Sequence, residues 1–166
     1  MTAASSLHVE SVEPTALPSA PQEVWRAVRH GQERARLALW WEGTPLLKGE
    51  RLGTIGALSA IDPADAVSLV RHGCQRLAAR GCSRVLAPMD GTTWAPYRCR
   101  LDPPLGFVGE PVPGPRWQTI LSAAGFQTQT RYLSSFCSDL GVRRSAPRAR
   151  RHLAGVSLCE IGRAHV

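Results

Sequence analysis

The sequence is poor in lysine and has no long hydrophobic run. Lys48 is the single lysine among 20 basic residues, a bias that we attribute to the base composition of the gene. The longest apolar runs are much shorter than the roughly 18 residues of a membrane-spanning helix. The N-terminal segment does not combine a basic start with an apolar core, as a signal peptide would. We therefore expect a cytoplasmic protein with no membrane partner.

Motifs that hold metals or activate nucleophiles are also missing. The five cysteines are odd in number, widely spaced and contain no Cys-x-x-Cys pair, which argues against disulfides and against zinc. His30, His72 and His152 have no metal-ligand spacing, and we place them on the surface. No Ser, Cys or Thr lies in a nucleophile motif, and there is no glycine-rich phosphate loop. We therefore expect no bound metal.

The positive charge is concentrated near the C-terminus. Before residue 141 the chain has 14 basic and 12 acidic residues, whereas from residue 141 onward it has six basic and one acidic. Most of this excess lies in residues 143–151, RRSAPRARR, which have no aromatic side chains to stack on bases. The segment predicts a solvated linker, with contact to phosphates as the alternative. We expect no nucleic-acid partner.

The order of the apolar segments predicts a mixed sheet. Residues 34–41 and 53–61 have the pattern of two antiparallel strands joined by a turn. A helix over residues 62–80 and a strand over residues 82–89 follow, which makes a βαβ unit with parallel strands. We therefore predict an α/β protein with a central mixed sheet flanked by helices. Ligands bind such sheets near the carboxyl ends of the parallel strands.

Capping residues define the helix over residues 62–80. Asp62 is a typical N-cap, Pro63 suits the first helical position, and Gly81 suits the C-terminal stop. The apolar residues at helical spacing predict its buried stripe. They are Val67, Val70, Cys74, Leu77 and Ala78.

Four further segments have weaker patterns. Residues 21–30 begin with proline and predict a helix. Residues 116–124 predict a short helix with Gly125 as its left-handed cap, and the alternation over residues 127–136 predicts a final strand. We also expect a short strand at residues 7–11.

Composition divides the chain into four parts. Residues 1–20 predict a flexible tail, residues 21–140 a domain, and residues 141–159 an arginine-rich linker with the start of a truncated second domain. Residues 160–166, EIGRAHV, resemble a translated sequencing adapter that is foreign to the natural gene. We therefore expect the natural protein to continue into a further domain; a true C-terminal tail is the alternative.

Over residues 34–136 the sequence resembles the GNAT superfamily of acyl-CoA N-acyltransferases. The resemblance rests on LGTIGAL, VLAPMDGTTWAPYR and AAGFQTQTRYL, with the strand end APMD similar to the GPMN of a bacterial subgroup. It implies a GNAT-like fold in which a strand and its following helix hold the pyrophosphate of coenzyme A, while the next strand splays away to admit the pantetheine arm. Acetyl-CoA or another acyl-CoA would be the cosubstrate. The residues implied to contact it are Leu58, Ser59, Ala64, Asp65, Ala66, Ala87 and Met89.

Two features depart from the family pattern. The coenzyme loop of the family, Q/R-x-x-G-x-G/A, is replaced by SAIDPADA, which lacks the glycines. Asp62 and Asp65 place carboxylates where a helix N-terminus would otherwise attract phosphate, and we expect both simply to cap the helix. The family's tyrosine in the closing helix, which protonates the thiolate, is replaced here by Leu121.

Polar and aromatic residues follow the strand over residues 82–89. Asp90 is the candidate proton acceptor, and Tyr97, or else Tyr132, is the substitute acid; packing in the core or at its rim is the structural alternative for both tyrosines. Asp90 and Tyr97 are therefore the candidate catalytic residues. The candidate acceptor-binding residues are Thr92, Thr93, Trp94 and Arg98. In the structural alternative, Asp90 is chosen for the geometry of a turn.

The resemblance implies transfer of an acyl group, by default acetyl, from acyl-CoA to an amine of a small molecule or a peptide. The alternative is a catalytically inactive GNAT-fold module that binds or scaffolds within a larger protein. Fold does not decide between them.

Overall fold

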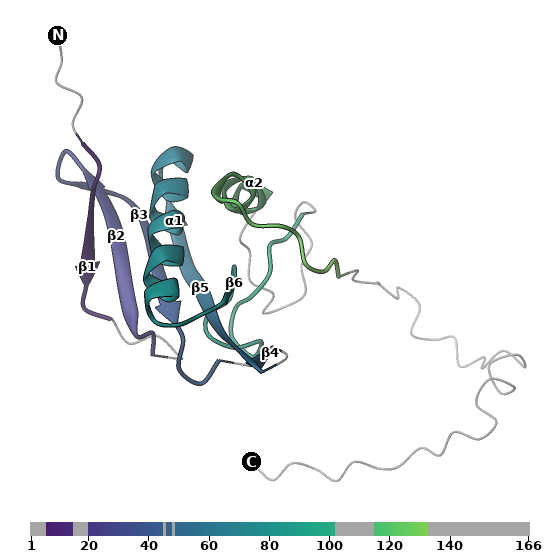
Figure 1. The fold of residues 1–166 in the computed structure, drawn as a ribbon. Helices are drawn as coiled ribbons and strands as arrows, with labels where there is room; N and C mark the ends of the chain where they lie inside the picture. Colours follow the sequence, from purple (N-terminus) through teal and green to yellow (C-terminus); the bar gives the residue numbers. More distant parts are fainter. Residues whose placement is uncertain (1–5, 15–19, 45, 48, 102–114, 133–166) are drawn as a thin grey trace, which may run out of the picture. The chain divides into compact units, whose positions relative to one another are not determined.

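The computed structural model describes residues 6–14, 20–44, 46–47, 49–101 and 115–132 of the 166-residue chain (Figure 1). The chain divides into two units, Met1–Thr128 and Gln129–Val166, and the helices and strands named below belong to the first. The predicted linker over residues 141–159 and the segment over residues 160–166 lie outside the described residues. Among the described helices, none is long and apolar enough to cross a membrane.

The described strands form one mixed sheet. They are β1 (His8–Val12), β2 (Glu23–Arg29), β3 (Gln32–Trp40), β4 (Leu46–Leu47), β5 (Glu50–Ala60) and β6 (Arg84–Leu86). The first three and β5 pair antiparallel in the order β1-β2-β3-β5, and the short β4 pairs with the start of β5. β6 runs parallel to β5, with Thr54 opposite Leu86. Both strand pairings predicted from the sequence are therefore confirmed.

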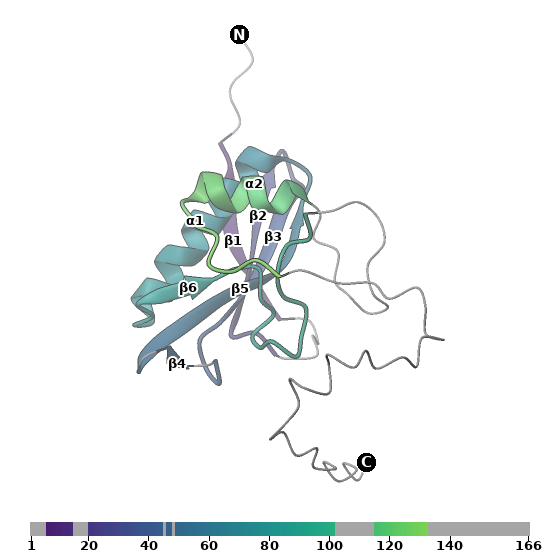
Figure 2. The ribbon, with the colours of Figure 1, turned by 90° about the vertical axis from the view of Figure 1, so that its right-hand side faces the viewer.

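Helix α1 (Pro63–Ala79) connects β5 to β6 and packs on the sheet (Figures 1 and 2). Its predicted caps are confirmed, because Asp62 accepts hydrogen bonds from the first turn and Gly81 has a left-handed φ of 82°. The predicted buried stripe is partly wrong: Ala78 is exposed, and Val67 and Cys74 are only half-buried. The residues that are buried instead or as well are Ala66, Leu69, Val70, Gly73 and Leu77.

Gly73 explains this difference in the stripe. A Cβ at this position would lie 3.2 Å from Leu39, 3.3 Å from Ile55 and 3.4 Å from Leu37. The absence of a side chain therefore brings the Gly73 face of α1 directly against β3 and β5. Sequence periodicity missed this face because glycine carries no apolar signal.

The helix predicted over residues 21–30 is wrong, because Glu23–Arg29 is the strand β2. Successive side chains of β2 alternate between the two faces of the sheet. Trp25 and Ala27 pack in the cluster under α1, whereas Val24 packs with Ala38 and Trp40 in a second cluster. Pairing with β1 on one side and β3 on the other satisfies the backbone of β2 and overrides the local helical signal.

The short strand predicted at residues 7–11 is confirmed within one residue as β1, and it belongs to the sheet and not to a free tail. The final strand predicted over residues 127–136 is not observed in its described half, since residues 127–132 have no regular structure. The other half lies outside the described residues.

Helix α2 (Pro115–Ala124) packs beside α1 (Figure 2). Ile120 and Leu121 are buried in the common core, and Gly125 follows the helix with a φ of 106°, so the predicted helix and cap are confirmed. Arg71 of α1 donates a hydrogen bond to the carbonyl of Ala123 at 2.7 Å. The burial of one face and this hydrogen bond at its end therefore hold α2 on the fold.

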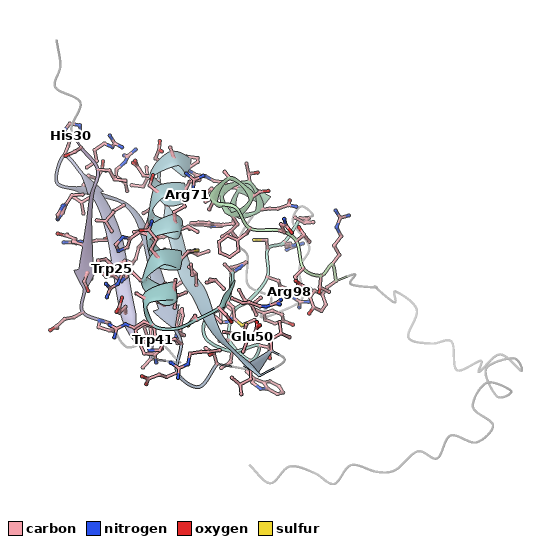
Figure 3. All side chains as sticks on the ribbon, viewed as in Figure 1. Trp25, His30, Trp41, Glu50, Arg71 and Arg98 are labelled. Atoms are coloured by element: carbon pink, nitrogen blue, oxygen red, sulfur yellow. The ribbon has the colours of Figure 1, made fainter. Side chains whose placement is uncertain are left out.

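A network centred on Glu23 joins β2 to the end of α1. The Glu23 carboxylate accepts hydrogen bonds from Arg80 at 2.7 Å, from Arg76 at 2.9 Å and from the indole of Trp25 at 2.8 Å. The Arg76 guanidinium lies over the Trp25 ring and that of Arg80 over the Trp41 ring, with Trp25 and Trp41 both visible along α1 in Figure 3. Burial alone would raise the pKa of Glu23, but these hydrogen bonds outweigh it and bring the pKa to about 2.

His72 is not the surface residue that the sequence suggests. Its ring is half-buried and meets the Trp25 ring edge-on, with 4.4 Å between centroids. Burial therefore lowers the pKa of His72. His30 is exposed at the β2–β3 turn, as predicted (Figure 3), and His152 lies outside the described residues.

Candidate functional site

A bulge in β5 lies at the centre of the candidate site. The register between β5 and β3 shifts between Arg36 and Ala38. Ala57, in the shifted part of β5, has a left-handed φ of 47°, which is unusual for a residue with a side chain. The residue before it, Gly56, is buried beneath the end of the neighbouring parallel strand. The bulge therefore re-aims the strand just before its carboxyl end.

The segment after β6 forms a closed loop over residues 88–98. Its base is held by hydrogen bonds from Arg98 N–H to the carbonyl of Pro88 at 3.0 Å and from Asp90 N–H to the carbonyl of Pro96 at 2.9 Å. The two ends of this loop are also joined by an antiparallel β-bridge between Met89 and Tyr97. We call residues 88–98 the strand-end loop.

The strand-end loop is fastened to β5. The N–H of Met89 donates to the carbonyl of Ile55 at 2.9 Å, and the N–H of Ala57 donates to Oδ1 of Asp90 at 2.7 Å. Regular pairing of β5 with β6 ends at Thr54 and Leu86, one residue before Ile55 in β5 but three residues before Met89. The contacts of Met89 and Asp90 therefore close the point at which the two parallel strands part.

Asp90 is half-buried in this contact. Burial raises the pKa of its carboxyl group, and the hydrogen bond from Ala57 N–H acts in the opposite direction. Gly91, which follows it, has a φ of 80° and packs against the ring of Trp40. The turn geometry that the structural alternative predicts at Asp90 is therefore present, together with a hydrogen bond to β5 that it did not predict.

The candidate acceptor residues do not converge on one pocket. Trp94 is 96% exposed at the tip of the strand-end loop, so it walls no pocket among the described residues. Thr93 is also exposed, while Thr92 is half-buried and its hydroxyl accepts a hydrogen bond from Trp94 N–H at 3.2 Å. The Arg98 guanidinium lies over the half-buried ring of Tyr97, 4.9 Å from its centroid, as part of the base of the loop (Figure 3).

The candidate coenzyme-binding residues fall into two groups. Ala66 and Met89 are buried, and Leu58 and Ala87 pack half-buried against the core. Ser59 and Ala64 are exposed, next to the start of α1.

The N-terminus of α1 is occupied by its own cap. Oδ1 of Asp62 accepts hydrogen bonds from the N–H groups of Ala64 at 2.8 Å and Asp65 at 3.2 Å. The N–H of Ala66 donates to the carbonyl of Asp62 at 3.1 Å. Since these N–H groups already have acceptors and the cap is a carboxylate, the site fits a phosphate anion poorly. The capping role predicted for Asp62 is confirmed.

Asp65 is a buried ion-pair partner and not a second cap. Only 4% of the residue is exposed. Its carboxylate accepts hydrogen bonds from Arg29 at 2.6 Å and from Arg34 at 3.3 Å. Hydrogen bonding from Arg29 is the main reason that its pKa is lowered. Asp65 therefore ties α1 to the β2–β3 hairpin and does not face a ligand.

We expect Asp65→Asn to lower the free energy of unfolding by about 2 kcal/mol, because an amide accepts weaker hydrogen bonds from two arginines that face a buried site. The same substitution at Asp62, which is more exposed and lies 3.9 Å from Arg34, is the control and should change stability by less than about 1 kcal/mol. Urea denaturation at pH 7 measures both. Equal effects would contradict the buried role of Asp65.

An open hollow of about 200 Å³ lies beside the end of β5. Its lining residues are Glu33, Arg34, Ala35, Ser59, Ala60 and Ile61. It is smaller than the roughly 300 Å³ at which ligand pockets begin. The carbonyl of Ile61 accepts a hydrogen bond from Arg116 of α2 at 2.7 Å, which fixes this end of the strand.

Some residues that shape the site were not identified from the sequence. Gly56 and Ala57 form the bulge, and an isolated glycine inside a strand pattern is the signal that points to one. Arg29 and Arg34 neutralise Asp65, but no local pattern links them to a residue more than 30 positions away. Among the described residues, no group of three His, Cys, Asp or Glu side chains could hold a metal ion.

No family model matches the chain, and no curated protein matches it. The crystal structure of a transcriptional regulator from Bacillus halodurans C-125 is similar, with a TM-score of 0.44 and 17% sequence identity over 69% of this chain. This chain covers 65% of that chain, slightly less than two thirds of its length. A similarity at this TM-score supports no conclusion about function.

Proposed function

We propose that the chain is a GNAT-like N-acyltransferase domain that moves an acyl group, by default acetyl, from acyl-CoA to an amine. The observation that carries the proposal is the parting of two parallel strands, β5 and β6, after Thr54 and beside the bulge of β5. Ligands of α/β sheets bind at such strand ends. Two of the sequence motifs of the resemblance, LGTIGAL and VLAPMDGTTWAPYR, contain the residues in contact there, Ile55 and Ala57 on one side and Met89 and Asp90 on the other.

The residues of this chain favour catalysis by positioning. Asp90 already accepts a hydrogen bond from β5, and Tyr97 belongs to the base of the strand-end loop. Acyl transfer between an amine and a thioester gains most from holding the two together. The chain therefore supports a slow transferase in which no described side chain is assigned to proton transfer.

A catalytically inactive binding module is the second candidate, and the cap of α1 favours it. Asp62 occupies the N–H groups that would otherwise face a pyrophosphate. A domain with the same fold and a closed coenzyme site would serve another part of a larger protein.

Asp62→Gly separates the two candidates. Glycine is tolerated at an N-cap at a cost of only a few tenths of a kcal/mol, and the change frees two N–H groups and removes a negative charge. If acyl-CoA binds, calorimetric titration with acetyl-CoA should show affinity about two- to fivefold higher than that of the unmodified protein. Asp62→Asn is the matched control, because it removes the charge but keeps a capping oxygen.

Three outcomes of this titration are informative. Tight binding by the unmodified protein would show that the cap does not oppose the coenzyme. Stronger binding by Asp62→Gly alone supports the acyltransferase. No binding by any of the three proteins supports the inactive module.

A further inference from the structure

The contact between the Asp90 carboxylate and the Ala57 amide has the features of a specific structural contact. It joins two segments that are 33 residues apart in sequence, and its hydrogen bond of 2.7 Å is charge-assisted when Asp90 is ionised. The donor of this hydrogen bond, the Ala57 amide, belongs to a residue with a left-handed φ of 47°. Strain of this kind persists only where the surroundings over-determine it. Among the described side chains, that of Asp90 accepts the hydrogen bond from the Ala57 amide.

Neighbouring contacts allow little freedom around Asp90. A Cβ on Gly56 would collide with Oδ1 of Asp90 and would lie 2.6 Å from the carbonyl oxygen of Met89. Gly91, the residue after Asp90, is also close to Trp40, since a Cβ there would lie 2.9 Å from the ring. The backbones of β5 and of the strand-end loop therefore touch, and the Asp90 carboxylate lies in their contact.

We propose that Asp90 is a positioning residue, which fastens the strand-end loop to the bulge of β5 and is not the proton acceptor of the site. Its Oδ1 holds the Ala57 N–H, so this oxygen is committed to the backbone. The loop that carries Thr92, Thr93 and Trp94 then keeps its place relative to β5 because of Asp90. The functional consequence rests on the proposed acyltransferase, whereas the fastening role does not.

Amide hydrogen exchange measured by NMR tests the fastening role directly. Asp90→Ala should speed exchange of the Ala57 amide by at least about tenfold, because a charge-assisted hydrogen bond is lost. Asp90→Asn, which keeps an acceptor oxygen at the same place, should restore protection to within about threefold. The Val70 amide, in the middle of α1, reports global unfolding, and exchange of the Ala57 amide should accelerate by more than exchange of the Val70 amide does.

Two further variants protect the experiment against misfolding and non-specific effects. Asp90→Ser keeps a polar side chain that is too short to reach the Ala57 amide, and it replaces Asp90→Ala if that protein does not fold. Glu42→Ala removes an exposed carboxylate and should leave Ala57 exchange unchanged.

Unchanged exchange of Ala57 in folded Asp90→Ala or Asp90→Ser would overturn the proposal, as would equal acceleration in Asp90→Asn. An acetyl-transfer assay gives the second readout: a positioning residue predicts that Asp90→Asn retains activity within about threefold, whereas a proton acceptor predicts a loss of about a hundredfold or more. If the unmodified protein shows no transfer, the proposed function fails, and the exchange data alone decide the role of Asp90.

Discussion

Replacement of Glu23 by alanine is expected to lower the free energy of unfolding by about 3 kcal/mol at pH 7, since it removes the acceptor of four hydrogen bonds, three of them from the two arginines Arg76 and Arg80. The carboxylate side chain is only 12% exposed, whereas Arg76 and Arg80 are accessible enough to be rehydrated. The loss is therefore large, but below the sum of four separate hydrogen bonds to a carboxylate. Urea denaturation measures it.

The same residue gives stability a defined pH dependence. The pKa of Glu23 is about 2 in the folded protein, against an ordinary value of 4.5. Its contribution is therefore fully present above about pH 5 and is lost as the pH falls from there toward 2. Unfolding measured at pH 7, 5 and 3 should show a shallower acid loss in Glu23→Ala than in the unmodified protein. Asp65 and Glu33, whose pKa values are also lowered, contribute to the remaining slope.

Glu50→Ala is the matched control for this prediction. Glu50 also accepts a hydrogen bond from an arginine, Arg84, at 2.8 Å, but both side chains are about half exposed. Its removal should change stability by less than about 1 kcal/mol. If Glu50→Ala and Glu23→Ala were equally destabilising, burial would not be the reason for the strength of the Glu23 network.

Local signals explain why the centre of the fold could be predicted from the sequence. The cap at Asp62 and the stop at Gly81 act within a few residues of the helix ends, and the order strand, helix, strand then determines the parallel pairing of β5 and β6. The strand β2 was mistaken for a helix because its local composition is ambiguous. Its pairing with two neighbouring strands, which sequence periodicity does not report, decides its conformation.

In the candidate site, too, the sequence predicts what local signals and topology determine and misses what depends on contacts between distant segments. Its position at the ends of two strands follows from topology, so Asp90 could be singled out from the sequence. The partner of Asp90 could not, because a backbone amide at a bulge leaves no side-chain signal. Asp65 illustrates the converse: a carboxylate in the first turn of a helix has the sequence signature of a cap, and only the packing of the β2–β3 hairpin brings Arg29 and Arg34 to it.

Gly56→Ala is expected to destabilise the protein by about 3 kcal/mol and to detach the strand-end loop from β5. The added Cβ would meet the backbone carbonyl of Met89 at 2.6 Å. That carbonyl cannot move away without weakening the hydrogen bond from Met89 N–H to Ile55, which is 2.9 Å long. We therefore also expect faster hydrogen exchange at Ala57 in this variant.

Gly53→Ala provides the comparison, because it adds the same methyl group three residues earlier in β5. There the Cβ would meet the terminal methyl groups of Leu77 at 2.8 Å, and a flexible side-chain end can shift where a backbone carbonyl cannot. Its expected loss is about 1 kcal/mol, with Ala57 exchange unchanged. A loss in Gly56→Ala no larger than about 1 kcal/mol, with Ala57 exchange unchanged, would mean that the strand-end loop can move away from β5 at little cost. In that case neither Gly56 nor Asp90 would hold the two strand ends together.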